Sequence, residues 1–194
     1  GTPVTVNGQT TSLSAGSLTT VARADHVHTL TNAMVLLQSY TLTSNTASIA
    51  FTSIPTRFNV LILASSVKCT STSAQAAAWL GARFNSDTGN NYLNQASGAT
   101  DRIDAGITTV PASFLPSYFA NGWLTIYQPN STSVWKSGSL SYQNNGSTSA
   151  VSLGSWSGPS VIWKNTAAIT RIDLVETLGS NFATGSYVAL YGIE

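Results

Sequence analysis

The chain has 194 residues, a formal net charge of +1 and a charged fraction of only 8%. Nucleic-acid-binding proteins carry a basic stripe that neutralises phosphates, and no basic cluster occurs here, so we expect no nucleic-acid partner. No apolar run reaches the roughly 18 residues that a membrane-spanning helix requires, so we expect no insertion into a membrane. Cys69 is the only cysteine, which excludes an internal disulfide, and we interpret it as a small buried hydrophobic residue.

Residues 1–33 are small and polar and include no aromatic side chain. Such a segment cannot bury enough apolar surface to fold alone. We therefore predict an extended N-terminal arm or stem that neighbouring copies complete, and we expect a homotrimer because the stem has no core of its own. A disordered tail is the alternative interpretation.

The texture changes from residue 34 onward, where short apolar runs alternate with turn residues. The runs that we interpret as strands are 35–42, 48–51, 58–65, 78–84, 123–128, 134–143, 160–163, 168–176 and 186–193. Many short strands without a long helical period are typical of sandwiches and barrels, so we predict an all-β fold with one jelly-roll-like β-sandwich over residues 34–194. Residues 73–80 could instead form one or two helical turns, and that alternative stays open.

Several of these runs alternate with a period of two, which predicts the face that each side chain occupies. Ile172, Leu174 and Glu176 are expected on one face of their strand. Val188 and Leu190 are likewise expected to share a face of the last strand.

The only two histidines, His26 and His28, lie two residues apart. On an extended strand their side chains point the same way. Three parallel copies around a threefold axis would present six imidazoles, a set that suits octahedral coordination of a divalent transition metal such as Fe²⁺. Each ligating ring would need an acceptor for its other N–H, which Asp25 or a backbone carbonyl could supply. Two solvated loop histidines are the alternative.

The stretch GSLTTVARADHVH at residues 16–28 resembles the A-R-x-D-H-x-H element of bacteriophage tail fibres and related virion proteins. The matching positions are Ala22, Arg23, Asp25, His26 and His28. Thr29 follows, where the family element is often followed by proline. In those proteins the element lies in extended, intertwined trimeric segments, and paired histidines can hold an axial metal. The resemblance thus implies a homotrimer with a metal at His26 and His28.

A second resemblance covers much of residues 34–194. The stretch ARFNSDTGNNY (82–92) is similar to the R-F-N-x-D-T-G-x-N-Y element of a β-sandwich domain found at the C-termini of phage virion proteins. The terminal GSYVALYGI (185–193) is similar to the closing L-Y-G-I strand of that domain. The resemblance implies a tail-fibre, spike or head-decoration protein on the exposed surface of the particle, with other virion proteins as partners.

The first of these two stretches also contains part of a calcium-binding pattern. Asn85, Asp87 and Gly89 match the start of an N-x-D-x-G loop, but the later acidic ligands are missing. We therefore prefer a simple turn, with Asp87 bonded to nearby backbone and Gly89 at positive φ.

The sequence provides little for catalysis, and we expect no enzyme and no catalytic residues. Apart from the two histidines of the arm there is no base for a serine or cysteine nucleophile. Asp101 and Asp104 are the nearest carboxylate pair that could serve a glycosidase. We interpret them instead as part of a polar loop, with Arg102 as a local ion partner.

The tryptophans could serve either packing or sugar binding. Trp123, Trp135, Trp156 and Trp163 lie in or beside predicted strands. We expect them to pack in the core or at a subunit interface. Trp156 is the candidate for an exposed, ligand-binding side chain, because small turn residues surround it.

The patterns predict a non-enzymatic all-β protein, and the two resemblances imply that it is a structural protein of a bacteriophage virion, either a fibre, a spike or a capsid decoration or cement protein. Its arm would anchor it and its β-sandwich would be displayed. The alternative is a module at a tail-fibre tip that recognises a glycan of the host surface.

Overall fold

A computed structural model describes the backbone of residues 3–6, 9–12, 33–70, 78–94, 99–102, 105–110, 119–144, 154–176 and 179–194. Side chains are described for residues 33–70, 80–93, 119–141, 161–176 and 179–194. Every regular element in these ranges is a β-strand, so the protein is all-β as predicted. No helix of the described residues is long and apolar enough to cross a bilayer.

The chain divides into two compact units, Gly1–Thr31 and Asn32–Glu194. In the first unit, β1 (Pro3–Val6) and β2 (Gln9–Ser12) pair in antiparallel fashion. Our prediction places no strand here, although the Asn7-Gly8 dipeptide that separates the two strands in sequence is a typical hairpin signal.

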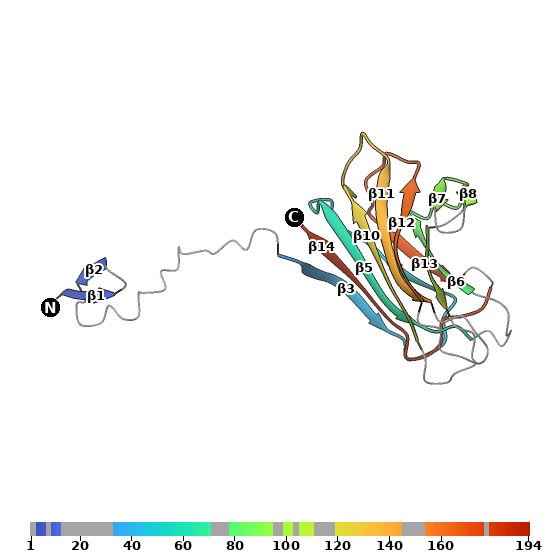
Figure 1. The fold of residues 1–194 in the computed structure, drawn as a ribbon, viewed down its shortest axis with the longest axis horizontal. Helices are drawn as coiled ribbons and strands as arrows, with labels where there is room; N and C mark the ends of the chain where they lie inside the picture. The colour runs from blue at the N-terminus through green and yellow to red at the C-terminus, as the bar shows by residue number, and fades with distance from the viewer. Residues whose placement is uncertain are drawn as a thin grey trace. The chain divides into compact units, whose positions relative to one another are not determined.

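The second unit consists of two antiparallel sheets packed face to face (Figure 1). Its strands are β3 (Val35–Thr41), β4 (Ser48–Phe51), β5 (Val60–Val67), β6 (Ala78–Phe84), β7 (Tyr92–Asn94), β8 (Ala99–Arg102), β9 (Ala105–Val110), β10 (Ala120–Tyr127), β11 (Lys136–Asn144), β12 (Gly154–Trp163), β13 (Ile172–Glu176) and β14 (Tyr187–Ile193). The large sheet has eight strands in the order β3-β14-β5-β10-β11-β12-β7-β8. The small sheet has four, in the order β4-β13-β6-β9.

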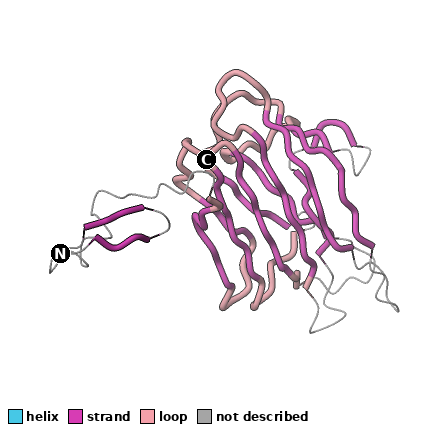
Figure 2. The backbone as a smooth tube through the Cα atoms, turned by 60° about the vertical axis from the view of Figure 1, so that its left-hand side comes forward, coloured by secondary structure: helices cyan, strands magenta, loops and turns pink. Residues whose placement is uncertain are grey.

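This strand order is that of a jelly roll with additions at one side. The strand sets β3-β14-β5-β10 and β4-β13-β6-β9 are the two four-stranded halves of the double-sheet jelly roll. Strands β11, β12, β7 and β8 continue the first half beyond β10. The predicted jelly-roll-like sandwich is therefore confirmed. In an eight-stranded jelly roll β10 would be the outermost strand of its sheet, but here it lies between β5 and β11. Figure 2 shows the strands of this wide sheet side by side.

The core lies between the two sheets and is built from alternate residues of each strand. On β13, Ile172, Leu174 and Glu176 are buried while the residues between them are partly exposed. On β14, Val188 and Leu190 are fully buried. Both predicted faces are therefore confirmed, since the period-two alternation of a strand places every second side chain between the sheets.

Side chains also close the open edge of the sandwich between β3 and β4. The Gln38 amide donates to the Thr52 carbonyl at 2.6 Å and accepts from the Thr52 amide at 3.3 Å. The Tyr40 hydroxyl donates to the Ala50 carbonyl at 3.1 Å. These contacts satisfy backbone groups at the edge of the small sheet, which would otherwise be open to pairing with another chain.

The expected polar loop at Asp101 and Arg102 and the possible helix at residues 73–80 differ from the structure wherever it describes them. Asp101 and Arg102 belong to β8 and not to a polar loop, because an edge strand can pair with β7 without an alternating apolar pattern. Ala78–Leu80, which could have ended a helix, forms the beginning of strand β6, whereas residues 71–77 lie outside the described residues.

Candidate functional site

The predicted metal ligands and the predicted sugar platform cannot be placed. His26, His28 and Asp104 lie outside the described residues. Trp156 is in β12, where its backbone pairs with that of Tyr142, but its side chain lies outside the described set. The side chains of Trp123, Trp135 and Trp163 and those of the R-F-N-x-D-T-G-x-N-Y element are described.

The R-F-N-x-D-T-G-x-N-Y element forms a polar turn that closes over a buried aromatic cluster. Asp87 accepts hydrogen bonds from Trp163 Nε1 at 2.7 Å, from Asn91 Nδ2 at 2.9 Å and from the Gly89 amide at 2.9 Å. Burial alone would raise the pKa of Asp87, but these three donors outweigh it, and the pKa falls below its ordinary value of 3.8. The carboxylate is thus held ionised by structural contacts.

The aromatic rings beneath this turn pack against one another. Tyr92 stacks on Trp163 with ring centroids 6.4 Å apart, and Phe84 meets the Trp163 ring edge-on at 5.5 Å. The Tyr92 hydroxyl accepts from the Phe84 amide at 2.8 Å, so the cluster is polar only where it meets the turn. Trp163 is 1% exposed, which confirms the expected core role for this tryptophan.

The start of the same turn has an unusual backbone that Asn85 stabilises. Asn85 and Ser86 have φ angles of 51° and 58°, and the Asp87 amide donates to the Phe84 carbonyl at 3.0 Å, as in a type I′ turn. The Asn85 side chain donates to the Ala168 carbonyl at 2.8 Å and accepts from the Thr170 amide at 2.9 Å. It therefore ties the turn to the segment that leads into β13.

The predicted turn was right in part and wrong at its glycine. Asp87 does bond nearby backbone, but Gly89 does not adopt a positive φ, because the chain reverses at Asn85 and Ser86 instead. Gly89 serves a close approach, since a Cβ there would lie 2.9 Å from Asn91 Nδ2. Among the described side chains, no three His, Cys, Asp or Glu residues gather closely enough to hold a metal ion, which leaves the calcium pattern without support.

The L-Y-G-I end of the chain likewise has a packing role. Leu190 is fully buried in β14. A Cβ on Gly192 would come within 2.6 Å of two atoms of the Phe58 ring, so the strand can pass over that ring only because the residue is glycine. Cys69, predicted to be a buried hydrophobic residue, is 0% exposed, which confirms that interpretation.

Two other tryptophans are exposed in the single chain, so they do not pack in its core, and the other expectation, packing at a subunit interface, stays a prediction. Trp123 of β10 is 50% exposed, and Trp135, in the loop between β10 and β11, is 55% exposed. Trp123 points to the outer face of the large sheet, the face turned away from the small sheet, because its neighbours Gly122 and Leu124 are the buried residues of β10. The alternation in ANGWLTIY predicts that Trp123 is exposed once Leu124 is assigned to the buried face.

An ordered strip of side chains runs along this outer face. On β10 the exposed or partly exposed positions include Trp123, Thr125 and Tyr127, and on β11 they include Ser137, Ser139 and Ser141. Each member on β10 lies directly opposite a serine, in the pairs Trp123–Ser141, Thr125–Ser139 and Tyr127–Ser137. The Tyr127 hydroxyl is 3.4 Å from the Ser139 hydroxyl. We call these six residues the aromatic–serine strip.

The other side of the strip is bordered by small and apolar side chains of β5. Ala64 lies opposite Trp123, and Val60 lies opposite Tyr127. Ala64 and Ser141, which lie directly opposite Trp123, are both small, and half of this residue is open to solvent. The strip is therefore an accessible surface with aromatic groups in one row and hydroxyls in the next.

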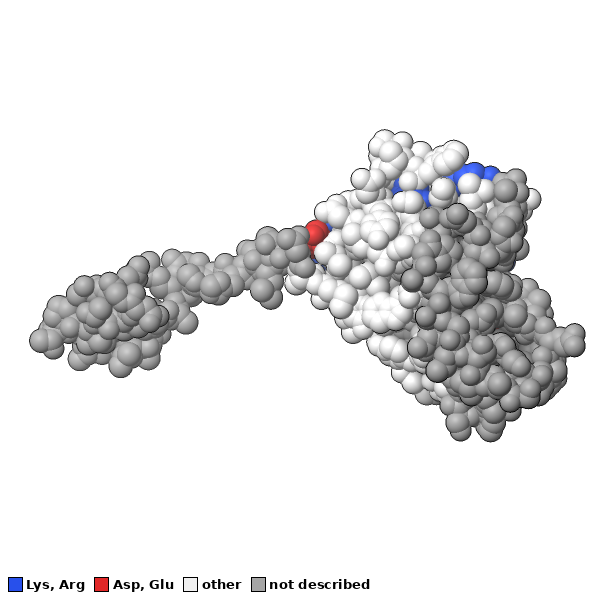
Figure 3. All heavy atoms as spheres, viewed as in Figure 1, with Lys and Arg blue, Asp and Glu red and all other residues white. Residues whose placement is uncertain are grey.

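The outer face carries no charged side chain on β5, β10, β11 or β14 within the described residues. Farther along, β14 presents Tyr187 and Tyr191, and both burial and the neighbouring Tyr187 raise the pKa of Tyr191 above its ordinary value. On the side of the molecule shown in Figure 3, Lys and Arg gather at one end and an acidic residue lies at one edge, while most of the described surface carries no charge.

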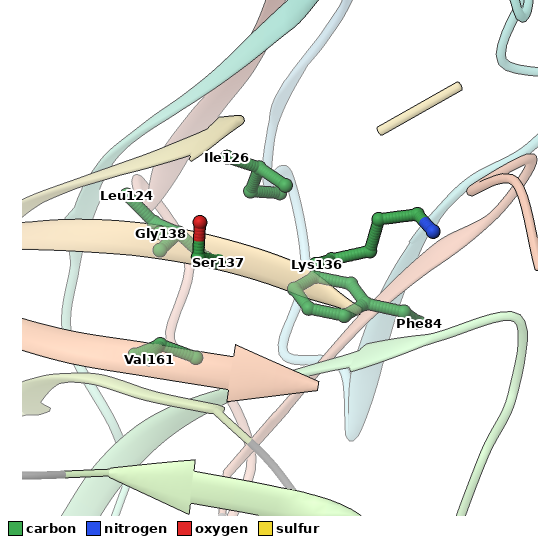
Figure 4. A pocket seen from close by; sticks show the side chains of 7 residues that line it. All are labelled: Phe84, Leu124, Ile126, Lys136, Ser137, Gly138 and Val161. Atoms are coloured by element: carbon green, nitrogen blue, oxygen red, sulfur yellow. The ribbon is translucent and has the colours of Figure 1, made fainter. Parts of the chain in front are cut away.

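A small pocket between the sheets is structural. It is lined by Phe84, Leu124, Ile126, Lys136, Ser137, Gly138 and Val161, and these side chains leave no room for a water molecule. Figure 4 shows the Lys136 stem passing Phe84 with its ammonium turned away from the apolar lining. The ammonium donates to the Val134 and Thr166 carbonyls, both at 3.0 Å, and burial lowers the pKa of Lys136. This lysine fastens two loops and faces no ligand space.

Neither a protein-family model nor a curated protein sequence matches the chain.

Proposed function

We propose that this chain is a non-enzymatic structural protein of a bacteriophage particle, a fibre, spike or capsid decoration protein that is anchored by its N-terminal arm and displays the jelly roll. The observation that carries the proposal is the structural role of the two stretches, residues 82–92 and 185–193, that resemble phage proteins. Asn85, Asp87 and Gly192 all form or shape the sandwich itself, so the resemblance rests on residues that specify a fold. A resemblance in such residues supports a common fold for the displayed domain and the β-sandwich domain of phage virion proteins.

The acidic side chains within the described ranges support a structural role. Asp87 is held by three donors, Asp173 pairs with Arg171, and Glu194 pairs with Arg57. Glu176 accepts from the Ser180 amide at 2.5 Å. Each of these carboxylates has partners within the fold, and none is poised with a second carboxylate across an open groove as glycoside hydrolysis requires.

We further propose that the chain acts as a homotrimer whose arms are joined in part by a divalent transition metal. The support is the sequence of the arm: His26 and His28 are two residues apart, would share one side of a strand if the arm is extended, and resemble the paired histidines of phage fibres. Three copies would supply six imidazoles, so the metal would fix the register of segments that have little apolar surface to bury.

Host-glycan recognition is a second candidate function, favoured by the exposed aromatic–serine strip. Trp123 and Tyr127 are 50% and 45% exposed on a sheet face. A purely structural role gives no reason for aromatic side chains to be exposed there. A displayed domain with a binding face would serve at the tip of a fibre.

The location in the particle can be tested directly. Particles of the phage that encodes this chain would be purified on a density gradient and their proteins quantified by mass spectrometry, with the major capsid protein as the copy-number standard. We expect the chain in the particles in a multiple of three copies, and antibody labelling should place it on the outer surface. Its absence from purified particles would refute the proposal.

A further inference from the structure

We infer that the aromatic–serine strip is a binding surface for a neutral oligosaccharide. Pyranose rings present flat patches of C–H groups, which pack on aromatic rings, and a rim of hydroxyls, which exchange hydrogen bonds with serine and threonine. Ligand sites in general combine aromatic lining with a few placed polar groups. The strip has both parts in adjacent rows, with Trp123 and Tyr127 beside Ser137, Ser139 and Ser141.

The spacing suits an extended chain of sugars. Trp123 and Tyr127 are four residues apart on one strand, which places them on the same face and about 13 Å apart along the strand. Thr125 and Ser139 lie between them and offer hydroxyls at the middle of the span. A single sugar could not contact both rings, so the ligand would be an oligosaccharide of several residues.

The strip is also held rigidly before any ligand arrives. Strand β10 is paired along its length with β5 on one side and β11 on the other. Its alternate residues Leu124 and Ile126 are anchored in the core at 0% and 1% exposure. Little backbone order would be lost on binding, which favours affinity for a ligand that makes few contacts.

The charge of the face indicates which sugars are suitable. No charged side chain lies on the outer face of β5, β10, β11 or β14 within the described residues, so there is no cation to pair with a sialic or uronic acid. An acidic glycan would therefore lose hydration of its carboxylates without a compensating partner. A neutral glycan has no such penalty.

A second copy of the chain fits this face less well. A dry protein contact would bury the hydroxyls of Ser137, Ser139 and Ser141, and each hydroxyl left without a partner costs free energy. An oligosaccharide brings its own hydroxyls to the serine row. The inference goes beyond the structural role and does not depend on it, because a chain absent from particles could still bind sugar, and a virion protein could fail to do so.

The test uses the purified full-length chain on an array of neutral and acidic oligosaccharides, followed by calorimetric titration with the best neutral binder. Trp123→Ala should weaken the association about tenfold or more, and Tyr127→Ala by a smaller factor. Trp135→Ala is the matched control, because Trp135 is equally exposed but lies in a loop outside the strip. It should change the affinity by less than about twofold.

Ser139→Trp provides a second variant that removes no packing. Its bulky ring would cover the strip between Trp123 and Tyr127 and should abolish binding while the melting temperature stays near that of the original chain. Three results would overturn the inference. The chain could bind no neutral oligosaccharide, or Trp123→Ala and Trp135→Ala could lower the affinity equally. Trp123→Ala could also lower the mass of the oligomer in solution. The last result would identify the face as a contact between copies.

Discussion

The indole Nε1 of Trp163 donates a 2.7 Å hydrogen bond to a carboxylate oxygen of Asp87, a residue 76 positions earlier in the chain. This bond joins the end of β12 in the large sheet to the turn that follows β6 in the small sheet. The two sheets are thus connected by a polar contact at the margin of an otherwise apolar core.

Loss of this carboxylate should destabilise the fold. Asp87→Ala would leave the buried Trp163 N–H, the Asn91 amide and the Gly89 N–H without their acceptor, and we expect a loss of about 2–3 kcal/mol in the free energy of unfolding. Urea titration followed by Trp fluorescence measures it. Thr88→Ala, at an exposed position of the same turn, should cost less than about 0.5 kcal/mol. Equal effects of the two substitutions would show that the carboxylate contributes nothing.

The same carboxylate should make stability depend on pH. Hydrogen bonds lower the pKa of Asp87 in the folded chain below its ordinary value of 3.8. Its contribution is therefore complete above about pH 4 and is lost as the pH falls through the lowered folded pKa. Asp87→Asn cannot titrate, so its free energy of unfolding should fall less between pH 5 and about pH 3 than that of the original chain. Parallel curves for the two proteins would contradict the assignment.

Asn85 should contribute through both its backbone and its side chain. Asn85→Ala places a residue with a Cβ at a φ of 51° and removes the bonds to Ala168 and Thr170, and we expect a loss of about 3 kcal/mol. Asn85→Gly keeps the turn unstrained and should cost about 1 kcal/mol less. Chemical denaturation of the two variants side by side separates the two causes. If glycine were as damaging as alanine, the backbone contribution would be absent.

Any side chain at Gly192 should destabilise the fold, because the Phe58 ring packs directly against this position. Gly192→Ala would force a Cβ to within 2.6 Å of the Phe58 ring, and overpacking of this kind costs about 1–3 kcal/mol. In a Phe58→Leu background the same substitution should cost less, because the smaller side chain leaves room for the methyl group. Thermal melts of the four proteins in this cycle measure the coupling, and strictly additive effects would show that the contact is not limiting.

Chelation should reveal whether metal joins the arms. Light scattering is expected to give three times the chain mass before treatment, and a strong chelator should lower it or make it depend on concentration. His26→Ala with His28→Ala should reproduce the chelated state without chelator. If the mass stays threefold under the chelator and in the double histidine variant, packing between the chains and not the metal holds the trimer together. A monomer in every case would contradict the trimer itself.

The alternation within strands made much of the core predictable. Ile172 and Leu174, like Val188 and Leu190, were correctly predicted to share a face, because a strand sends neighbouring side chains to opposite sides whatever its surroundings. Strands β7, β8 and β9 escaped prediction, since short strands at or beside a sheet edge, such as the one holding Asp101, need no apolar alternation.

The candidate binding surface was predictable only in its composition. Trp123 and Trp163 occupy similar strands in the sequence, yet one is 50% exposed and the other 1%. Trp156, the residue chosen from the sequence, was preferred because small residues flank it along the chain. Exposure on a sheet face depends instead on neighbours across strands, such as Ala64 and Ser141 beside Trp123.

The amino-acid sequence by itself determined the all-β class, the approximate strands and which residues of a strand share a face, because propensity and alternation act over a few residues. Only the tertiary structure decided which face of each strand the second sheet covers, and hence that Leu124 is buried and Trp123 exposed. It also decided that Asp87 meets Trp163. Those outcomes depend on pairings between distant strands, and the free energy that selects them comes from the whole core and not from any local segment.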